Sequence, residues 1–127
     1  MSDTDKQILG KWGEEQATHF LIKKNYNIID RNYALAKKGE IDIVAWHTKN
    51  KNQKTLCFVE VKTRSNQDSS AERSVGKKKM SALFVVARDY CIKKNIDMDN
   101  TYIQFEQISI YKYKDKIDIR HYEIPVY

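Results

Sequence analysis

Two short apolar segments, separated by a polar stretch, constrain the fold of this chain more than any other feature. Residues 40–46 read EIDIVAW and residues 55–64 read TLCFVEVKTR, and HTKNKNQK lies between them. Both segments are rich in β-branched and aromatic residues, which is typical of strands inside a sheet. The two segments are therefore expected to pair as antiparallel strands joined by a polar, exposed loop.

Charged side chains interrupt both apolar segments. Side chains of a strand point alternately to its two faces, so Glu60 and Lys62 share one face of the later strand. The earlier strand is predicted to have an acidic and an apolar face, with Glu40, Asp42 and Val44 on the first and Ile41 and Ile43 on the second. If the strands pair, Asp42 and Glu60 lie close together on the same side of the sheet.

Two neighbouring carboxylates suggest a metal site. Like charges repel, which raises the pKa of one acid, and a divalent cation relieves the repulsion. Mg²⁺ is typically held by one or two carboxylates together with water and phosphate oxygens. A lysine beside such a site, here Lys62, can orient or deprotonate a water nucleophile. The alternative from the spacing alone is a solvated ion pair between Glu60 and Lys62, which the apolar character of both strands disfavours.

The whole chain predicts a mixed α/β fold. Apolar residues at helical spacing predict a first helix, capped by Asp3 or Thr4, that ends near residue 24, and a second helix over 75–94. Strands are predicted over 26–35, 40–46, 55–64, 101–113 and 117–122. This α-β-β-β-α-β-β order favours a mixed central sheet flanked by helices, in a single domain that spans residues 1–127.

The charge of the chain indicates a polyanionic partner. The net charge is +6, and an excess of lysine favours nucleic acid through phosphate neutralisation. Lys77, Lys78 and Lys79 fall in the first turn of the second helix, where cations oppose the helix dipole. We therefore hypothesise that this turn grips a nucleic-acid backbone, the alternative being a solvated lysine run.

Other classes of protein are disfavoured by the sequence. The chain has no apolar run of the ~18 residues that a membrane span requires, and its charged N-terminus lacks the apolar region of a signal peptide. The protein is therefore expected in the cytoplasm without a membrane partner. Cys57 and Cys91 lie far apart among apolar residues, as reduced core thiols do, and the scattered histidines argue against structural zinc.

Several motifs of the chain resemble the YraN-like family of bacterial proteins. The segments GEIDIV over 39–44 and FVEVKTR over 58–64 are the most specific. Further matches, spread over about residues 10–110, are Gly13–Glu14 with Ala17 and Leu21, Arg31–Asn32, and Val75 and Lys79 with Ala87 and Tyr90. That family is placed in the PD-(D/E)xK nuclease superfamily and is similar to the archaeal Holliday-junction resolvases.

The resemblance implies a restriction-endonuclease-like fold and roles for particular residues. Asp42 and Glu60 would hold Mg²⁺ or Mn²⁺ together with the backbone carbonyl of Val61, and Lys62 would be the catalytic lysine. Glu14 would complete the acidic site. Glu40 is placed near the metal and Arg64 on a phosphate, and the resolvase-like relatives imply a homodimer.

Two features depart from the family pattern. The loop SNQDSSAERS over 65–74 has no glycine, and Gln104-Phe105-Glu106 stands where the family has an RFD-like motif. The expected function is a metal-dependent endonuclease that hydrolyses phosphodiester bonds of DNA, with branched or junction DNA among its substrates. The alternatives are a non-catalytic nucleic-acid-binding module with a nuclease-like fold and an adaptor that docks on a DNA-processing complex.

Overall fold

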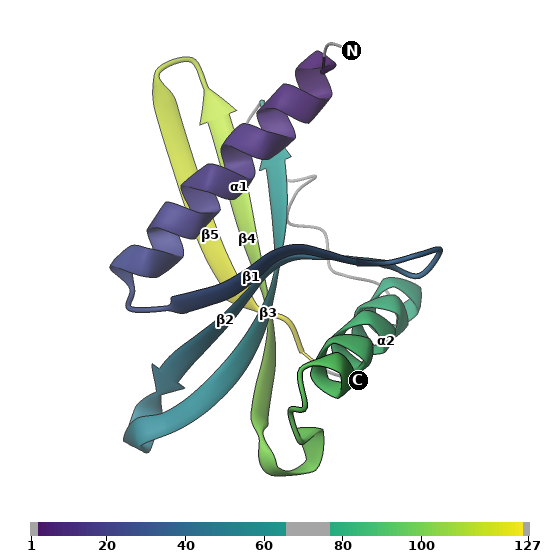
Figure 1. The fold of residues 1–127 in the computed structure, drawn as a ribbon. Helices are drawn as coiled ribbons and strands as arrows, with labels where there is room; N and C mark the ends of the chain where they lie inside the picture. The colour runs from purple at the N-terminus through teal and green to yellow at the C-terminus, as the bar shows by residue number, and fades with distance from the viewer. Residues whose placement is uncertain (1–2, 66–76, 126–127) are drawn as a thin grey trace.

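The computed structural model describes residues 3–65 and 77–125, with side chains of the second helix described from Met80 onward. Its helices and strands are, in chain order, α1 (Asp5–Lys23), β1 (Asn27–Leu35), β2 (Gly39–Lys49), β3 (Gln53–Arg64), α2 (Lys77–Lys93), β4 (Tyr102–Tyr113) and β5 (Lys116–Glu123) (Figure 1). Short 3-10 helices at Asn50–Asn52 and Met98–Asn100 join β2 to β3 and lead into β4. The expected helical start at Val75 lies outside the described residues.

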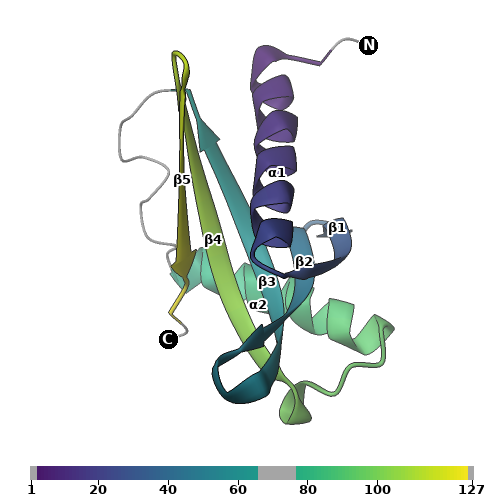
Figure 2. The same cartoon turned by 90° about the vertical axis from the view of Figure 1, so that its left-hand side faces the viewer.

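The strands form one sheet in the order β1-β2-β3-β4-β5, in which β3 and β4 are parallel and the other neighbours antiparallel. The parallel pair needs a crossover, and α2 supplies it. α1 covers one face of the sheet and α2 the other (Figures 1 and 2). The expected element order is confirmed, and it matches the restriction-endonuclease-like topology that the resemblance implies. No helix of the described residues is long and apolar enough to cross a membrane.

α1 begins and ends where its sequence predicts. The hydroxyl of Thr4 accepts a hydrogen bond from the backbone N–H of Gln7, and the Gln7 side chain accepts one from the N–H of Thr4. This reciprocal pair is a capping box, which satisfies N–H groups that the first turn leaves without partners. At the other end Asn25 takes a left-handed backbone with φ 68°, which stops the helix.

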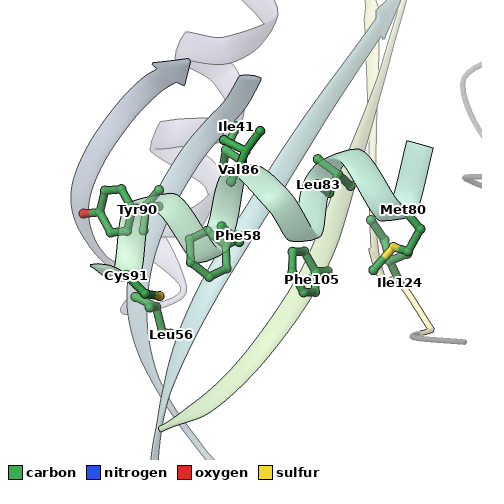
Figure 3. Packing of buried hydrophobic residues seen from close by; sticks show 12 residues of the cluster. Ile41, Leu56, Phe58, Met80, Leu83, Val86, Tyr90, Cys91, Phe105 and Ile124 are labelled. Carbon is green, nitrogen blue, oxygen red and sulfur yellow. The ribbon is translucent and has the colours of Figure 1, made fainter. Parts of the chain in front are cut away.

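The core lies on both faces of the central strand β3. Phe58 faces α2, where its ring stacks on Phe105 and meets the edge of Tyr90 (Figure 3). The next residue, Val59, faces α1 and packs in a second cluster with Leu21. Both faces of β3 are thus buried, which explains why its sequence is apolar at consecutive positions.

The alternation of faces breaks in β2, and one expectation is wrong there. Ile43 packs on the α1 side and Ile41 on the α2 side, so the two residues do not share a face. The paired residues of β2 and β3 begin at Ile43 and Val59, and Asn32 of the neighbouring strand has a left-handed backbone with φ 54°. From Asp42 toward the turn, β2 no longer pairs with β3. The β1–β2 hairpin therefore bends out of the sheet there, and it extends toward α2 (Figure 1).

The polar stretch between the two site strands is mostly strand. The exposed loop expected over residues 47–54 shortens to a turn, because β2 continues to Lys49 and β3 begins at Gln53. Lys51 and Asn52 make this tight turn with φ 62° and 60°. Lys49 points inward and bonds the buried Glu106 at 3.0 Å, which explains how a polar sequence extends a strand.

α1 approaches β3 more closely than a side chain would permit. A Cβ atom at Gly13 would lie 1.9 Å from Oγ1 of Thr63. Glycine, which has no side chain, lets the Thr63 side chain pack this closely against the helix backbone. The contact sets the depth of α1 over the sheet and so the position of the next residue, Glu14.

Gly13→Ala is expected to destabilise the protein by about 1–3 kcal/mol, since the new methyl group must displace Thr63 or the helix. Urea denaturation would measure the change. Gly10→Ala is the matched control, because nothing lies within 4 Å of a Cβ at Gly10. It should stabilise the helix by about 0.5–1 kcal/mol. Equal effects of the two substitutions would contradict the close approach.

Candidate metal centre

Three carboxylates from two distant parts of the chain meet at the bend in β2. Glu14 of α1 and Glu40 and Asp42 of β2 each offer one oxygen, and these oxygens lie within 4.8 Å of one another. Glu40 is exposed, whereas Glu14 and Asp42 are half-buried. The group is thus open to solvent on one side, as a site that exchanges a cation must be.

Backbone and amide groups fix the orientation of two of these carboxylates. Oδ2 of Asp42 accepts the backbone N–H of Val61 at 2.7 Å, beyond the last paired residues of β2 and β3. Oε2 of Glu14 accepts Nδ2 of Asn32 at 3.0 Å. Each carboxylate keeps a second oxygen for another partner.

Glu60 and Lys62 face the same hollow from β3. They form an ion pair of 3.1 Å, and Glu60 is only 8% exposed. Together with Asp42 they line a pocket of about 380 Å³ that α2 closes on one side. The ion pair that the spacing alone suggested is thus present, but inside a pocket and not on a solvated face. Glu60 is not a member of the three-carboxylate group.

Burial and like charge raise the pKa values of the site. Burial raises the pKa of Asp42 to about 7, and the charges of three acids, Glu14, Glu60 and Glu40, add to the rise. The hydrogen bond from the Val61 N–H lowers this pKa but does not offset the rise. Burial, followed by the charge of Glu40, also raises the pKa of Glu14. A cation among these groups would remove the repulsion. The donors are all carboxylate oxygens, the ligands that hard divalent cations prefer, whereas structural zinc sites are built mainly from cysteine and histidine.

A family model described as "Uncharacterised protein family UPF0102" matches residues 13–111, which include Glu14, Glu40, Asp42 and β3. The chain belongs to this family. A UPF0102 protein of Flavobacterium psychrophilum is 36% identical over 120 residues, which cover 94% of this chain and 93% of that protein. A UPF0102 protein of Clostridioides difficile is 39% identical over 110 residues, covering 86% and 90% of the two chains.

The structure describes only some of the remaining residues that were expected at the site of this UPF0102 chain. Arg64 follows Lys62 on β3, is half-buried, and bonds the carbonyl oxygen of Thr63 at 3.0 Å. The side chains of Lys77, Lys78 and Lys79, at the start of α2, lie outside the described residues. The N–H of Val61 serves Asp42, and the expected role of its carbonyl stays a prediction.

The sequence predicts no role for Asn32 and places Glu40 only near the metal. Asn32 belongs to the Arg31–Asn32 pair, which carried part of the resemblance without a role. The structure gives it one, because its amide bonds Glu14. Glu40 stands in the three-carboxylate group itself.

Asp42→Asn should stabilise the metal-free protein in a pH-dependent way. The pKa of Asp42 rises from 3.8 to about 7 on folding, so its charged form costs stability. Below about pH 4 the carboxyl is protonated in both states and the cost vanishes; from there it grows up to pH 7 and then stays constant. At pH 8 in EDTA we expect a gain on the order of 1–3 kcal/mol over wild type by urea denaturation. A gain that does not change between pH 4 and pH 8 would contradict the raised pKa.

Asn32→Gly should weaken Mn²⁺ binding about tenfold, as loss of a group that orients a ligand typically does. Glycine suits the left-handed backbone, so the change removes chiefly the amide. Asn25→Gly is the control, because Asn25 has a similar φ of 68° at the end of α1. Titration calorimetry should show unchanged affinity for the control. Equal affinities for both variants would show that Asn32 does not position Glu14.

Proposed function

We propose that this protein is a Mg²⁺- or Mn²⁺-dependent endonuclease that hydrolyses phosphodiester bonds of DNA, including branched or junction DNA, in the cytoplasm. The observation that carries the proposal is the convergence of Asp42, Glu60 and Lys62 on one pocket beside the Glu14–Glu40–Asp42 group. Family membership and the restriction-endonuclease-like topology support a place in the PD-(D/E)xK nuclease superfamily.

The residues at the pocket would have different roles in catalysis. Asp42, Glu60 and the carbonyl of Val61 would hold the cation, with Glu14 and Glu40 completing its acidic surroundings. The cation, when bound, would stabilise the charge that develops on the phosphate. Lys62 would orient the water nucleophile and take part in its deprotonation, and its ion pair with Glu60 fixes the position of its ammonium group.

The charge distribution supports a nucleic-acid substrate. The chain carries a net charge of +6 even though several acids gather at the pocket. A cationic surface around an acidic centre attracts a polyanion and leaves the acids for a metal. Arg64, two residues beyond Lys62, is proposed to contact a phosphate. The homodimer that the resolvase-like relatives imply stays a prediction.

Glu60→Gln and Lys62→Met should each lower the rate of DNA cleavage by about 100-fold or more, because each removes a group that acts on the metal or the nucleophile. The measurement is cleavage of plasmid, flapped and four-way junction DNA with Mg²⁺ and with Mn²⁺, using highly purified protein. Glu15→Gln serves as a matched control, since Glu15 adjoins Glu14 but forms an exposed ion pair with Arg31.

Three outcomes separate the candidate functions. Cleavage that falls in both site variants and persists in the control supports the endonuclease. The same cleavage rate in wild type and Glu60→Gln would contradict the proposal that this pocket catalyses the reaction. DNA binding without cleavage and without uptake of Mg²⁺ would favour the non-catalytic binding module instead.

A further inference from the structure

Two adjacent lysines lie in the turn of the β1–β2 hairpin, and Lys38 lines the pocket at the candidate metal centre. We propose that Lys37 and Lys38 bind phosphate groups of the nucleic-acid backbone next to the reacting phosphodiester. The inference rests on the proposed function and adds to it a second contact for the polyanion, in the β1–β2 turn and not on β3, where Arg64 lies. Lys37, Lys38 and Gly39 are called the hairpin tip below.

The hairpin tip is part of the wall of the catalytic pocket. Lys38 and Gly39 line the same hollow as Asp42, Glu60 and Lys62. The tip reaches this place because the hairpin turns out of the sheet at Asp42. A phosphate chain that enters the pocket would therefore meet Lys38 in its wall and Lys37 beside it in the turn.

Packing against α2 holds the hairpin in place. A Cβ atom at Gly39, which has φ 146°, would lie 3.6 Å from the side chain of Val86. On β1 the hydroxyl of Tyr33 donates to Asp89, and its ring meets the edge of Tyr90 with centroids 5.0 Å apart. Cations on a fixed support lose less entropy when they bind a ligand than cations on a free loop.

The charges of the hairpin tip are available to a ligand. Both lysines are exposed, and neither forms an ion pair with any described residue, whereas Lys62 deeper in the pocket is paired with Glu60. The carboxylates behind them would repel a phosphate backbone. Two exposed cations at the rim offset this repulsion where the backbone enters.

The test compares two double variants that remove the same charge from two hairpins. Lys37→Asn with Lys38→Gln neutralises the tip, and asparagine suits the left-handed backbone of position 37, where φ is 64°. Lys51→Asn with Lys54→Gln is the matched control, since Lys51 has φ 62° in the β2–β3 turn. That turn lies roughly 20 Å from Asp42, at the far end of β2.

Binding is measured by fluorescence anisotropy with a labelled DNA duplex and a four-way junction, across a series of salt concentrations. Ca²⁺ replaces Mg²⁺ to prevent cleavage. The tip variant should bind about tenfold more weakly at low salt, with a log–log salt slope smaller by about 1–2, as expected for one or two lost phosphate contacts. The control variant should keep the wild-type slope.

Each other outcome overturns the inference in a recognisable way. Equal losses in the two variants would show a general charge effect, and an unchanged tip variant would show no contact there. Weaker Ca²⁺ binding by the tip variant, measured by calorimetry, would show that the tip shapes the metal site instead. If wild type binds neither DNA, the proposed function fails as well, whereas the first three results leave it standing.

Discussion

The hydrogen bond from the Val61 N–H to Asp42 is the interaction on which the site depends. Regular pairing of β2 with β3 begins only at Ile43, so beyond this point the two strands need another link. The carboxylate of Asp42 supplies it at 2.7 Å. The same bond places an acid between the sheet and the turned-out hairpin, within reach of Glu14 from the opposite layer. The Asp42 carboxylate thus links two strands of the fold and also belongs to the candidate metal centre.

A second buried acid shows why the surroundings of Asp42 matter. Glu106 is 1% exposed, and burial alone would raise its pKa, yet hydrogen bonds from His121, Lys49 and Tyr26 hold it at about 2. Burial likewise raises the pKa of Asp42, but its neighbours are mostly acids that add to the rise, and its pKa reaches about 7. A carboxylate whose partners are all protein donors stabilises the fold, whereas one surrounded by acids favours a cation. Glu106 stands where the resemblance implies an RFD-like motif, and it faces the α1 side of the sheet, where it bonds Tyr26, away from the pocket.

Local patterns in the sequence predicted the elements but not the bend. The order of helices and strands follows from periodicity and caps, as the Thr4 capping box and Asn25 show. The prediction that Ile41 and Ile43 share a face is wrong, because it assumes that β2 is regularly pleated. The left-handed residue that accompanies the bend, Asn32, lies on the neighbouring strand β1, so the sequence of β2 does not reveal it. Spacing brought Asp42 and Glu60 together, but it could not bring in Glu14 from a distant helix. Only the resemblance predicted that Glu14 belongs to the site, and only the structure shows that Asn32 bonds Glu14.

In the proposed function, the charges at the pocket couple the binding of the metal ion to the binding of the nucleic acid. Without a cation, the carboxylates of Glu14, Glu40 and Asp42 repel the phosphate that Lys37 and Lys38 attract. A bound cation would turn this repulsion into attraction, so it would raise the affinity for the polyanion. By thermodynamic linkage the polyanion must then raise the affinity for the cation by the same factor. Burial is the main cause of the raised pKa of Asp42, and the negative charge of its acidic neighbours adds to it. The same local excess of negative charge would favour any cation that enters.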